Sequence, residues 1–187
     1  MTLRDIMTGV GIAALLSLAG CGEQADEQAA STEAAEKAAG GETIGAGLGD
    51  ATKFAEAAKA SGLDATLGGP GPYTVLIPTN AAFDKMPAGA LETLMKPEAR
   101  ADLTAVLTYH ILPGTMLAAD IAKAVDAGNG KAQLPTMAGG TLTATKEGDA
   151  IVITDAAGTK ARLAGEDQRS NGVIHRVDAV LMPGAAT

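Results

Sequence analysis

Apolar side chains recur at helical spacing through the first part of the chain. Phe54, Ala57 and Ala58 fall on one side of a predicted helix that Asp50 would cap and Gly62 would end. A short apolar run bounded by two prolines, 73–77, predicts a strand. Four further helices are predicted. One begins at Thr79–Asn80, a second lies around 91–95, a third starts at Pro97 and contains Leu103, Val106 and Leu107, and a fourth spans 117–127.

The second part of the chain alternates between apolar and polar residues, as β-strands do. Strands are predicted over 141–145, 150–154, 160–164 and 173–182, with turn-forming Gly, Asp and Asn residues between them. Helices gathered early and antiparallel strands gathered late predict an α+β domain, and no internal repeat is visible. We expect this domain to span residues 43–184, followed by a short tail over 185–187.

The start of the chain has the pattern of an export signal. Residues 6–20 form an apolar run of fifteen residues, which is short for a membrane span and suits the hydrophobic part of a signal peptide. The run ends in Leu18-Ala19-Gly20-Cys21, which resembles a bacterial lipobox, where the cysteine thiol takes up a diacylglyceryl group. We therefore predict a signal peptide over 1–20 and lipidation of Cys21, the single cysteine of the chain. The alternative is an ordinary signal peptide followed by an incidental thiol.

An acidic segment of small residues joins Cys21 to the domain. Residues 22–41 contain no apolar residue larger than Ala, so burial cannot offset the entropy of ordering them, and we predict a flexible tether over 21–42. By resemblance to enterobacterial lipoproteins, Gly22 in place of Asp permits export to the outer membrane. The net charge is −8, but residues 43–187 hold 12 basic and 15 acidic side chains with no basic stripe. This balance argues against nucleic-acid binding.

Three segments carry a resemblance to a known family. The first joins an apolar strand to a Pro-Thr-Asn turn, the second is centred on a Tyr-His pair, and the third opens with Asn-Gly before the last strand. They are 73–83, with Thr79, Asn80 and Phe83; 109–114, with Tyr109, His110, Ile111 and Leu112; and 171–183, with Asn171, Gly172 and His175. In this order and separation they resemble the fasciclin domain family.

The resemblance implies a wedge of antiparallel β-strands with several helices packed against it. It also implies a role in adhesion or matrix contact, because members of the family are mostly anchored or secreted. The Tyr-His segment has been linked to receptor binding in animal relatives, which makes Tyr109, His110, Ile111 and Leu112 candidate partner-binding residues. The residues themselves favour a second interpretation, in which hydrogen bonds from the His110 ring hold a fixed turn. The other named residues of the three segments are expected to be structural.

Residue patterns of known catalytic, metal or cofactor sites are absent. His175 shares strand parity with Val173 and Val177, which predicts a buried, hydrogen-bonded core residue. A metal pair of His110 and His175 has no H-x-x-x-H or similar spacing to support it. Ser170 does not lie in a nucleophile elbow. We therefore expect no cofactor, no metal and no enzymatic activity.

The sequence predicts a lipid-anchored module of the cell envelope, facing the periplasm or the surface, that binds a protein or a matrix polysaccharide. The alternative is a small-ligand carrier or sensor with a groove between helices and sheet. Neither the partner nor the oligomeric state follows from the residues.

Overall fold

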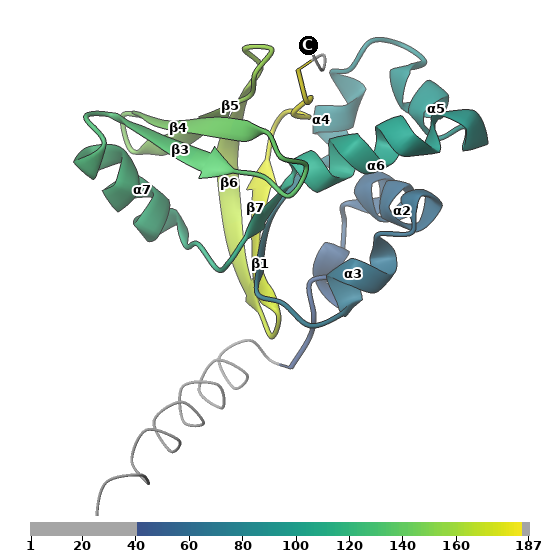
Figure 1. Ribbon diagram of the computed structural model, residues 1–187, viewed down its shortest axis with the longest axis horizontal. Helices are drawn as coiled ribbons and strands as arrows, with labels where there is room; N and C mark the ends of the chain where they lie inside the picture. Colours follow the sequence, from purple (N-terminus) through teal and green to yellow (C-terminus); the bar gives the residue numbers. More distant parts are fainter. Residues whose placement is uncertain (1–40, 185–187) are drawn as a thin grey trace, which may run out of the picture.

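The computed structural model describes residues 41–184 of the chain (Figure 1). The predicted signal peptide over 1–20, Cys21, the tether before residue 41 and the tail 185–187 therefore lie outside the described residues.

Helices occupy most of the first part of the domain, as predicted. They are η1 (Ala46–Leu48), α2 (Thr52–Ser61), α3 (Asp64–Gly68), α4 (Asn80–Asp84), α5 (Ala90–Leu94), η2 (Pro97–Ala99), α6 (Arg100–Tyr109) and α7 (Ala118–Ala127). The strands are β1 (Tyr73–Pro78), β2 (Ile111–Pro113), β3 (Lys131–Pro135), β4 (Thr141–Glu147), β5 (Ala150–Thr154), β6 (Lys160–Arg169) and β7 (Gly172–Val177).

The strands form one curved sheet in the order β2-β1-β7-β6-β5-β4-β3. The predicted α+β class is confirmed. One pairing departs from the expected antiparallel arrangement, because β1 and β7 run parallel, with Tyr73 opposite Gly172 and Leu76 opposite His175. The curvature brings the two outer strands together, and the Met137 N–H donates to the Ile111 carbonyl at 2.8 Å.

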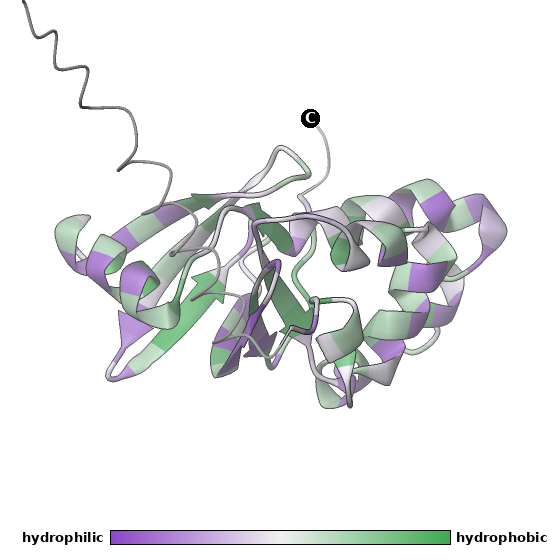
Figure 2. Cartoon of the chain, turned by 90° about the horizontal axis from the view of Figure 1, so that it is seen from below, coloured by the Kyte–Doolittle hydropathy of each residue, from purple (hydrophilic) through white to green (hydrophobic). Residues whose placement is uncertain are grey.

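The central strands separate two apolar cores. Val75 and Ile77 of β1 face the core shared with α2 and α6, whereas Leu76 faces the core enclosed by the curved sheet and α7. Because both faces of β1 are covered, its residues 74–78 are all buried. Figure 2 shows the apolar residues concentrated on the strands, with polar residues on the outer sides of the helices.

The last predicted strand is shorter than expected, because side chains replace its hydrogen-bonding partners. β7 ends at Val177, although the apolar run continues to Met182. The amide of Leu181 donates to the His110 ring at 3.0 Å, and the amide of Met182 donates to the Asp155 carboxylate at 2.9 Å. An apolar run by itself cannot distinguish these partners from a neighbouring strand.

Four short elements, η1, α3, β2 and β3, were not predicted, and β6 was predicted five residues too short. α3, β2 and β3 contain five, three and five residues, which leaves too few positions to establish a period. β6 continues to Arg169 instead of ending at residue 164, and its second half is polar because it pairs with β7 along a solvent-exposed face.

Candidate functional site

The three segments that resemble one family meet at the centre of the sheet. β1 pairs with β7 over Tyr73–Pro78 and Gly172–Val177, and pairs on its other edge with β2. The second, first and third segments are therefore adjacent as β2, β1 and β7, although they are widely separated in the sequence.

Asn171 holds the start of β7 to two loops of the helical part. Its side-chain Oδ1 accepts from the Ile44 N–H at 2.7 Å, and its Nδ2 donates to the carbonyls of Leu67 and Gly69 at 2.9 and 2.7 Å. The side chain is buried, so these backbone groups have no water to replace it. The structural role expected of Asn171 from the sequence stays a prediction.

The Tyr-His segment is enclosed by the protein. The exposed fractions of Tyr109, His110, Ile111 and Leu112 are 1%, 1%, 1% and 0%. The Tyr109 hydroxyl donates to the Thr141 carbonyl and accepts from the Ala156 N–H, both at 3.3 Å. Burial raises the pKa of this phenol. In this fold a surface partner has no access to the four candidate side chains.

The His110 ring is held between two backbone groups. Nδ1 lies 2.8 Å from the Val106 carbonyl, and Nε2 lies 3.0 Å from the Leu181 N–H. Because a carbonyl only accepts and an amide only donates, the neutral ring with its proton on Nδ1 satisfies both. Burial lowers the pKa of His110 from 6.5 to about 4. The ring therefore joins α6 to the segment that follows β7.

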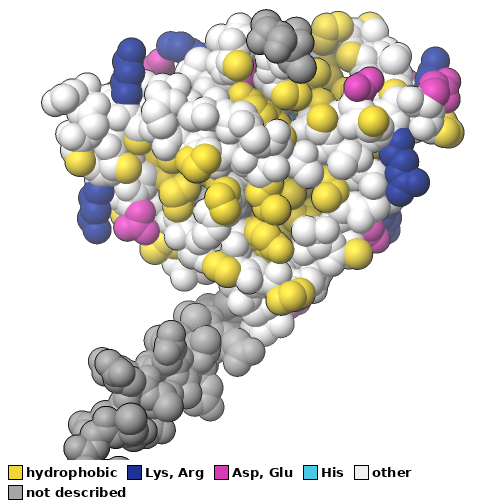
Figure 3. Space-filling model, in the orientation of Figure 1, with side chains coloured by type: hydrophobic (Ala, Val, Ile, Leu, Met, Phe, Trp, Pro, Cys, Tyr) yellow, Lys and Arg dark blue, Asp and Glu magenta, His cyan; other side chains and the backbone are white. Residues whose placement is uncertain are grey.

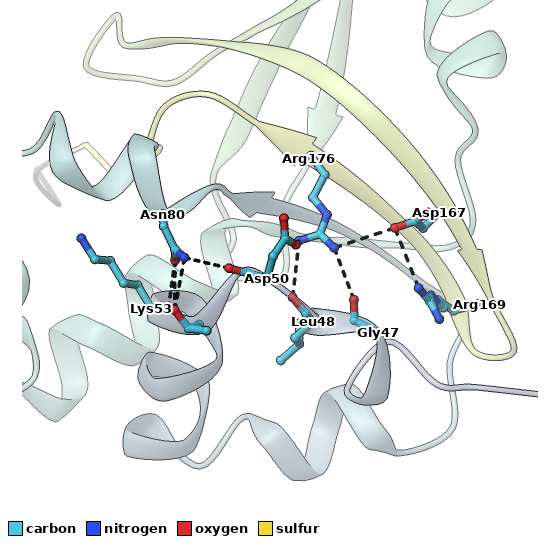
Figure 4. Close-up of polar contacts among 9 residues, drawn as sticks. Gly47, Leu48, Asp50, Lys53, Asn80, Asp167, Arg169 and Arg176 are labelled. Atoms are coloured by element: carbon cyan, nitrogen blue, oxygen red, sulfur yellow. Dashed lines mark hydrogen bonds and ion pairs between the residues drawn. The ribbon is translucent and has the colours of Figure 1, made fainter.

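The Pro-Thr-Asn turn caps two helices. Thr79 is the N-cap of α4, and its hydroxyl accepts from the Ala82 N–H at 3.2 Å. Asn80 reaches across to α2, where its Oδ1 accepts from the Lys53 N–H at 3.2 Å and its Nδ2 donates to the Asp50 carbonyl at 2.7 Å (Figure 4). Phe83 is buried in the helical core.

The predicted capping of α2 by Asp50 is wrong. Ala51 occupies the N-cap position and makes no side-chain cap. The Asp50 carboxylate instead lies 3.1 Å from Arg176, and Asn80 supplies the acceptor from a distant part of the sequence.

We expect Asn80→Ala to lower the free energy of unfolding by about 1–2 kcal/mol, because α2 loses its capping acceptor. Asn80→Asp keeps that acceptor near the start of the helix and should lose less. Urea denaturation of the two variants measures the difference, with exposed Gln168→Ala as a control expected to change stability by less than about 0.5 kcal/mol. Equal losses in Asn80→Ala and Asn80→Asp would contradict this account of the cap.

Two arginines on the outer face of β6 and β7 hold the segment that precedes α2 (Figure 4). Arg176 lies 3.1 Å from Asp50 and donates to the carbonyls of Leu48 and Gly47 at 3.4 and 3.5 Å. Arg169 lies 2.8 Å from Glu42. This cluster was not predicted from the sequence, although Arg176, a charged residue within an apolar final strand, was a usable signal.

Asp167 lies 3.8 Å from each of these arginines. The cluster therefore combines two arginines with three carboxylates, and each arginine is paired with two of them. We assign it a structural role, the attachment of the first residues of the domain to the sheet.

The surface has hollows, but large apolar side chains of the first two family segments are buried. Leu76, Ile77, Ile111 and Leu112 are buried, and Met137 is the large apolar residue that stands exposed in the described part of the chain. Hollows of about 500 and 370 Å³ lie beside the β6–β7 turn and beside α4. Figure 3 shows apolar side chains in the middle of one face and charged side chains around its edge.

The remaining candidate chemistry is limited. His175 is fully buried, as its strand parity predicted, and its Nε2 lies 2.8 Å from the Met116 carbonyl. Within residues 41–184, no three His, Cys, Asp or Glu side chains are placed to hold a metal ion. Over the same residues, none of the helices is both long and apolar enough to cross a membrane.

Comparison with known families gives a match to the fasciclin domain over residues 49–183. The chain belongs to the fasciclin domain family. The three adjacent segments at the centre of the sheet are therefore parts of a fasciclin domain, and their side chains are largely used to connect its strands to its helices.

Bacterial and animal fasciclin proteins are similar to this one. Protein sll1483 of Synechocystis is 37% identical over 150 residues, covering 79% of this chain and 72% of that protein. The transforming growth factor-beta-induced protein ig-h3 of Sus scrofa is 39% identical over 70% of this chain, but only 17% of its own length is matched. The cell surface glycolipoprotein MPB83 of Mycobacterium bovis is 36% identical over 64% of this chain and 47% of its own.

A solved structure shares the fold. The domain pair from the insect cell adhesion molecule fasciclin I aligns with a TM-score of 0.55 at 23% identity, over 73% of this chain and 46% of that chain. This likeness shows that the curved sheet with its packed helices is the fasciclin fold.

Proposed function

We propose that this fasciclin protein is anchored in the cell envelope by a lipid on Cys21 and acts as an adhesion or interaction module without enzymatic activity. The observation that carries the proposal is the position of the lone cysteine. It lies directly after an apolar run of signal-peptide length and is joined by a short acidic segment to a fasciclin domain.

The relatives support display outside the cytoplasm. MPB83 is a cell surface glycolipoprotein by name, and fasciclin I is an insect cell adhesion molecule. The partner of the present protein would be another protein or a matrix polysaccharide. Because the Tyr-His segment is buried, such a partner would bind other parts of the surface.

The attachment point of the tether suits a domain suspended from a membrane. The Glu42 carbonyl accepts from the Ser170 N–H at 2.9 Å, so the chain enters the domain beside the turn between β6 and β7. A flexible segment of the length of residues 22–41 has an average reach of about 25 Å. With Gly22 after the cysteine, we place the anchor in the outer membrane.

We expect Cys21→Ala to move the protein from the membrane fraction to the soluble fraction or to leave its signal peptide uncleaved, because the variant has no thiol to lipidate. Intact mass of the wild type should show a chain that begins at Cys21 and carries a diacylglyceryl-type adduct. Ser17→Ala, inside the apolar run, is the matched control and should remain membrane-bound. An unmodified wild-type chain in the soluble fraction would overturn the anchor.

The same strains test the adhesion part of the proposal. Where the Cys21→Ala protein leaves the membrane fraction, cells that carry it should attach to each other and to matrix-coated surfaces as weakly as cells without the protein. Equal attachment by wild-type cells and cells without the protein would overturn the adhesive role and leave the anchor standing.

A further inference from the structure

A small pocket lies where β5 and β6 separate, next to the start of α7. β6 pairs with β5 from Lys160 to Arg162 and with β7 from Leu163 onward, with a register shift between Leu163 and Gly165. The opening has a volume of about 220 Å³. Ala118, Ala150, Ile151 and Leu163 form its apolar wall, and Asp149, Glu166 and His175 supply its polar groups.

One nitrogen of the His175 ring lacks a hydrogen-bonding partner. The side chain is 0% exposed, and its Nε2 lies 2.8 Å from the Met116 carbonyl. Because a carbonyl only accepts, Nε2 carries the proton of the neutral ring and Nδ1 presents a lone pair. Among the described residues, nothing donates to Nδ1. A buried acceptor without a donor costs free energy, so this atom requires an explanation.

Glu166 places a second acceptor beside that lone pair. Its Oε2 lies 3.8 Å from Nδ1 of His175 and accepts from the Ala118 N–H at 2.6 Å. Within residues 41–184, no lysine or arginine lies within 4 Å of this carboxylate. The start of α7 therefore faces a carboxylate and an imidazole lone pair, with no donor side chain between them.

We propose that this pocket binds the primary ammonium group of a small alkylamine. An ammonium nitrogen about 2.9 Å from each acceptor would donate to both, and its charge would be balanced by Glu166 and Asp149. The apolar wall suits a short alkyl chain. An anion would be repelled by the two carboxylates, and a metal ion would lack a third placed ligand within the described residues. The proposal is independent of the lipid anchor and of adhesion.

The test uses the two histidines of the chain as reporters. The full chain, labelled in its histidine rings and purified in a non-ionic detergent, is titrated by NMR with butylammonium at about pH 8, where an ordinary imidazole is neutral. We expect a saturable shift of the His175 signals and none of the His110 signals. Tetramethylammonium has the same charge but no N–H, and butanol has no charge; neither should produce the shift.

Two variants separate the carboxylate from the overall charge. Glu166→Gln keeps an oxygen that can accept from the Ala118 N–H, and it should bind butylammonium at least about tenfold more weakly. Glu147→Gln removes one negative charge at an exposed position and should bind like the wild type. If the pocket holds only water, butylammonium produces no saturable shift of the His175 signals, and the proposal is overturned. It is equally overturned by an equal response to tetramethylammonium, or by undiminished binding in Glu166→Gln.

Discussion

Gly172→Ala is expected to destabilise the domain by at least about 4 kcal/mol, enough to prevent stable folding of many domains of this size. Gly172 begins β7 opposite Tyr73, with φ +151°, a conformation that residues with a Cβ rarely adopt. A Cβ at this position would lie well inside 3.0 Å of the Tyr73 carbonyl oxygen, which belongs to the backbone of the neighbouring strand. The parallel β1–β7 pair would have to separate to admit a methyl group. Urea denaturation, or the yield of folded protein, measures the loss.

Gly148→Ala is the matched control for this substitution. Gly148 also has a positive φ, +64°, but a Cβ there would have nothing within 4 Å. We expect it to lose about 1–2 kcal/mol, the cost of the left-handed conformation alone. If Gly172→Ala were no more destabilising than Gly148→Ala, the close approach of β1 and β7 would not be the reason for the glycine.

Acidification from pH 7 to about pH 4 is expected to remove about 3 kcal/mol of stability through His110 alone. Burial lowers the pKa of this ring to about 4 in the folded protein, whereas the unfolded chain has the ordinary value of 6.5. Between these two values the unfolded state binds the additional proton, so the free energy of unfolding falls as the pH is lowered through the window. The contribution is fully present above pH 6.5 and is lost below about pH 4.

The geometry explains why the protonated ring is disfavoured. A proton on Nε2 would face the Leu181 N–H, so two donors would meet where one donor and one acceptor now pair. Protonation of His110 should therefore place a positive charge in the core and also release the segment after β7.

Urea denaturation at several pH values isolates this effect when the wild type is compared with His110→Gln, which retains a donor and an acceptor but does not titrate. The free energy of unfolding of the wild type should fall more steeply than that of the variant between pH 6.5 and about 4. NMR of the native protein should place the His110 midpoint near the lower value. Parallel pH profiles for the two proteins would show that His110 is not the titrating group.

Much of the fold follows from local patterns. The strand at 73–77, the Thr79 cap of α4 and the helical stripe of α6 were predicted because each depends on residues close together in the sequence. The three family segments were found for the same reason. Their meeting as β2-β1-β7 was not visible, since it depends on pairings between residues far apart in the sequence.

The candidate partner-binding residues show where sequence reasoning stops. Tyr109 and His110 combine aromatic and polar groups, a composition that serves either a binding surface or a satisfied core position. In the structure both side chains are buried, and they contact Thr141, Ala156 and Leu181. Those contacts come from segments 30 residues or more away, so no local pattern could report them.

The sequence by itself determined the longer helices and strands, the family segments and the burial of His175 by strand parity, because helical and strand periods are properties of neighbouring residues. Only the tertiary structure decided that Asn80 caps α2, that Asn171 holds two loops of the helical part, and that Glu166 lies beside Nδ1 of His175. Each of these contacts joins residues from different elements. A side chain can bond any backbone group that the fold brings within about 3 Å, and that group is selected by packing of the whole domain, not by spacing along the chain.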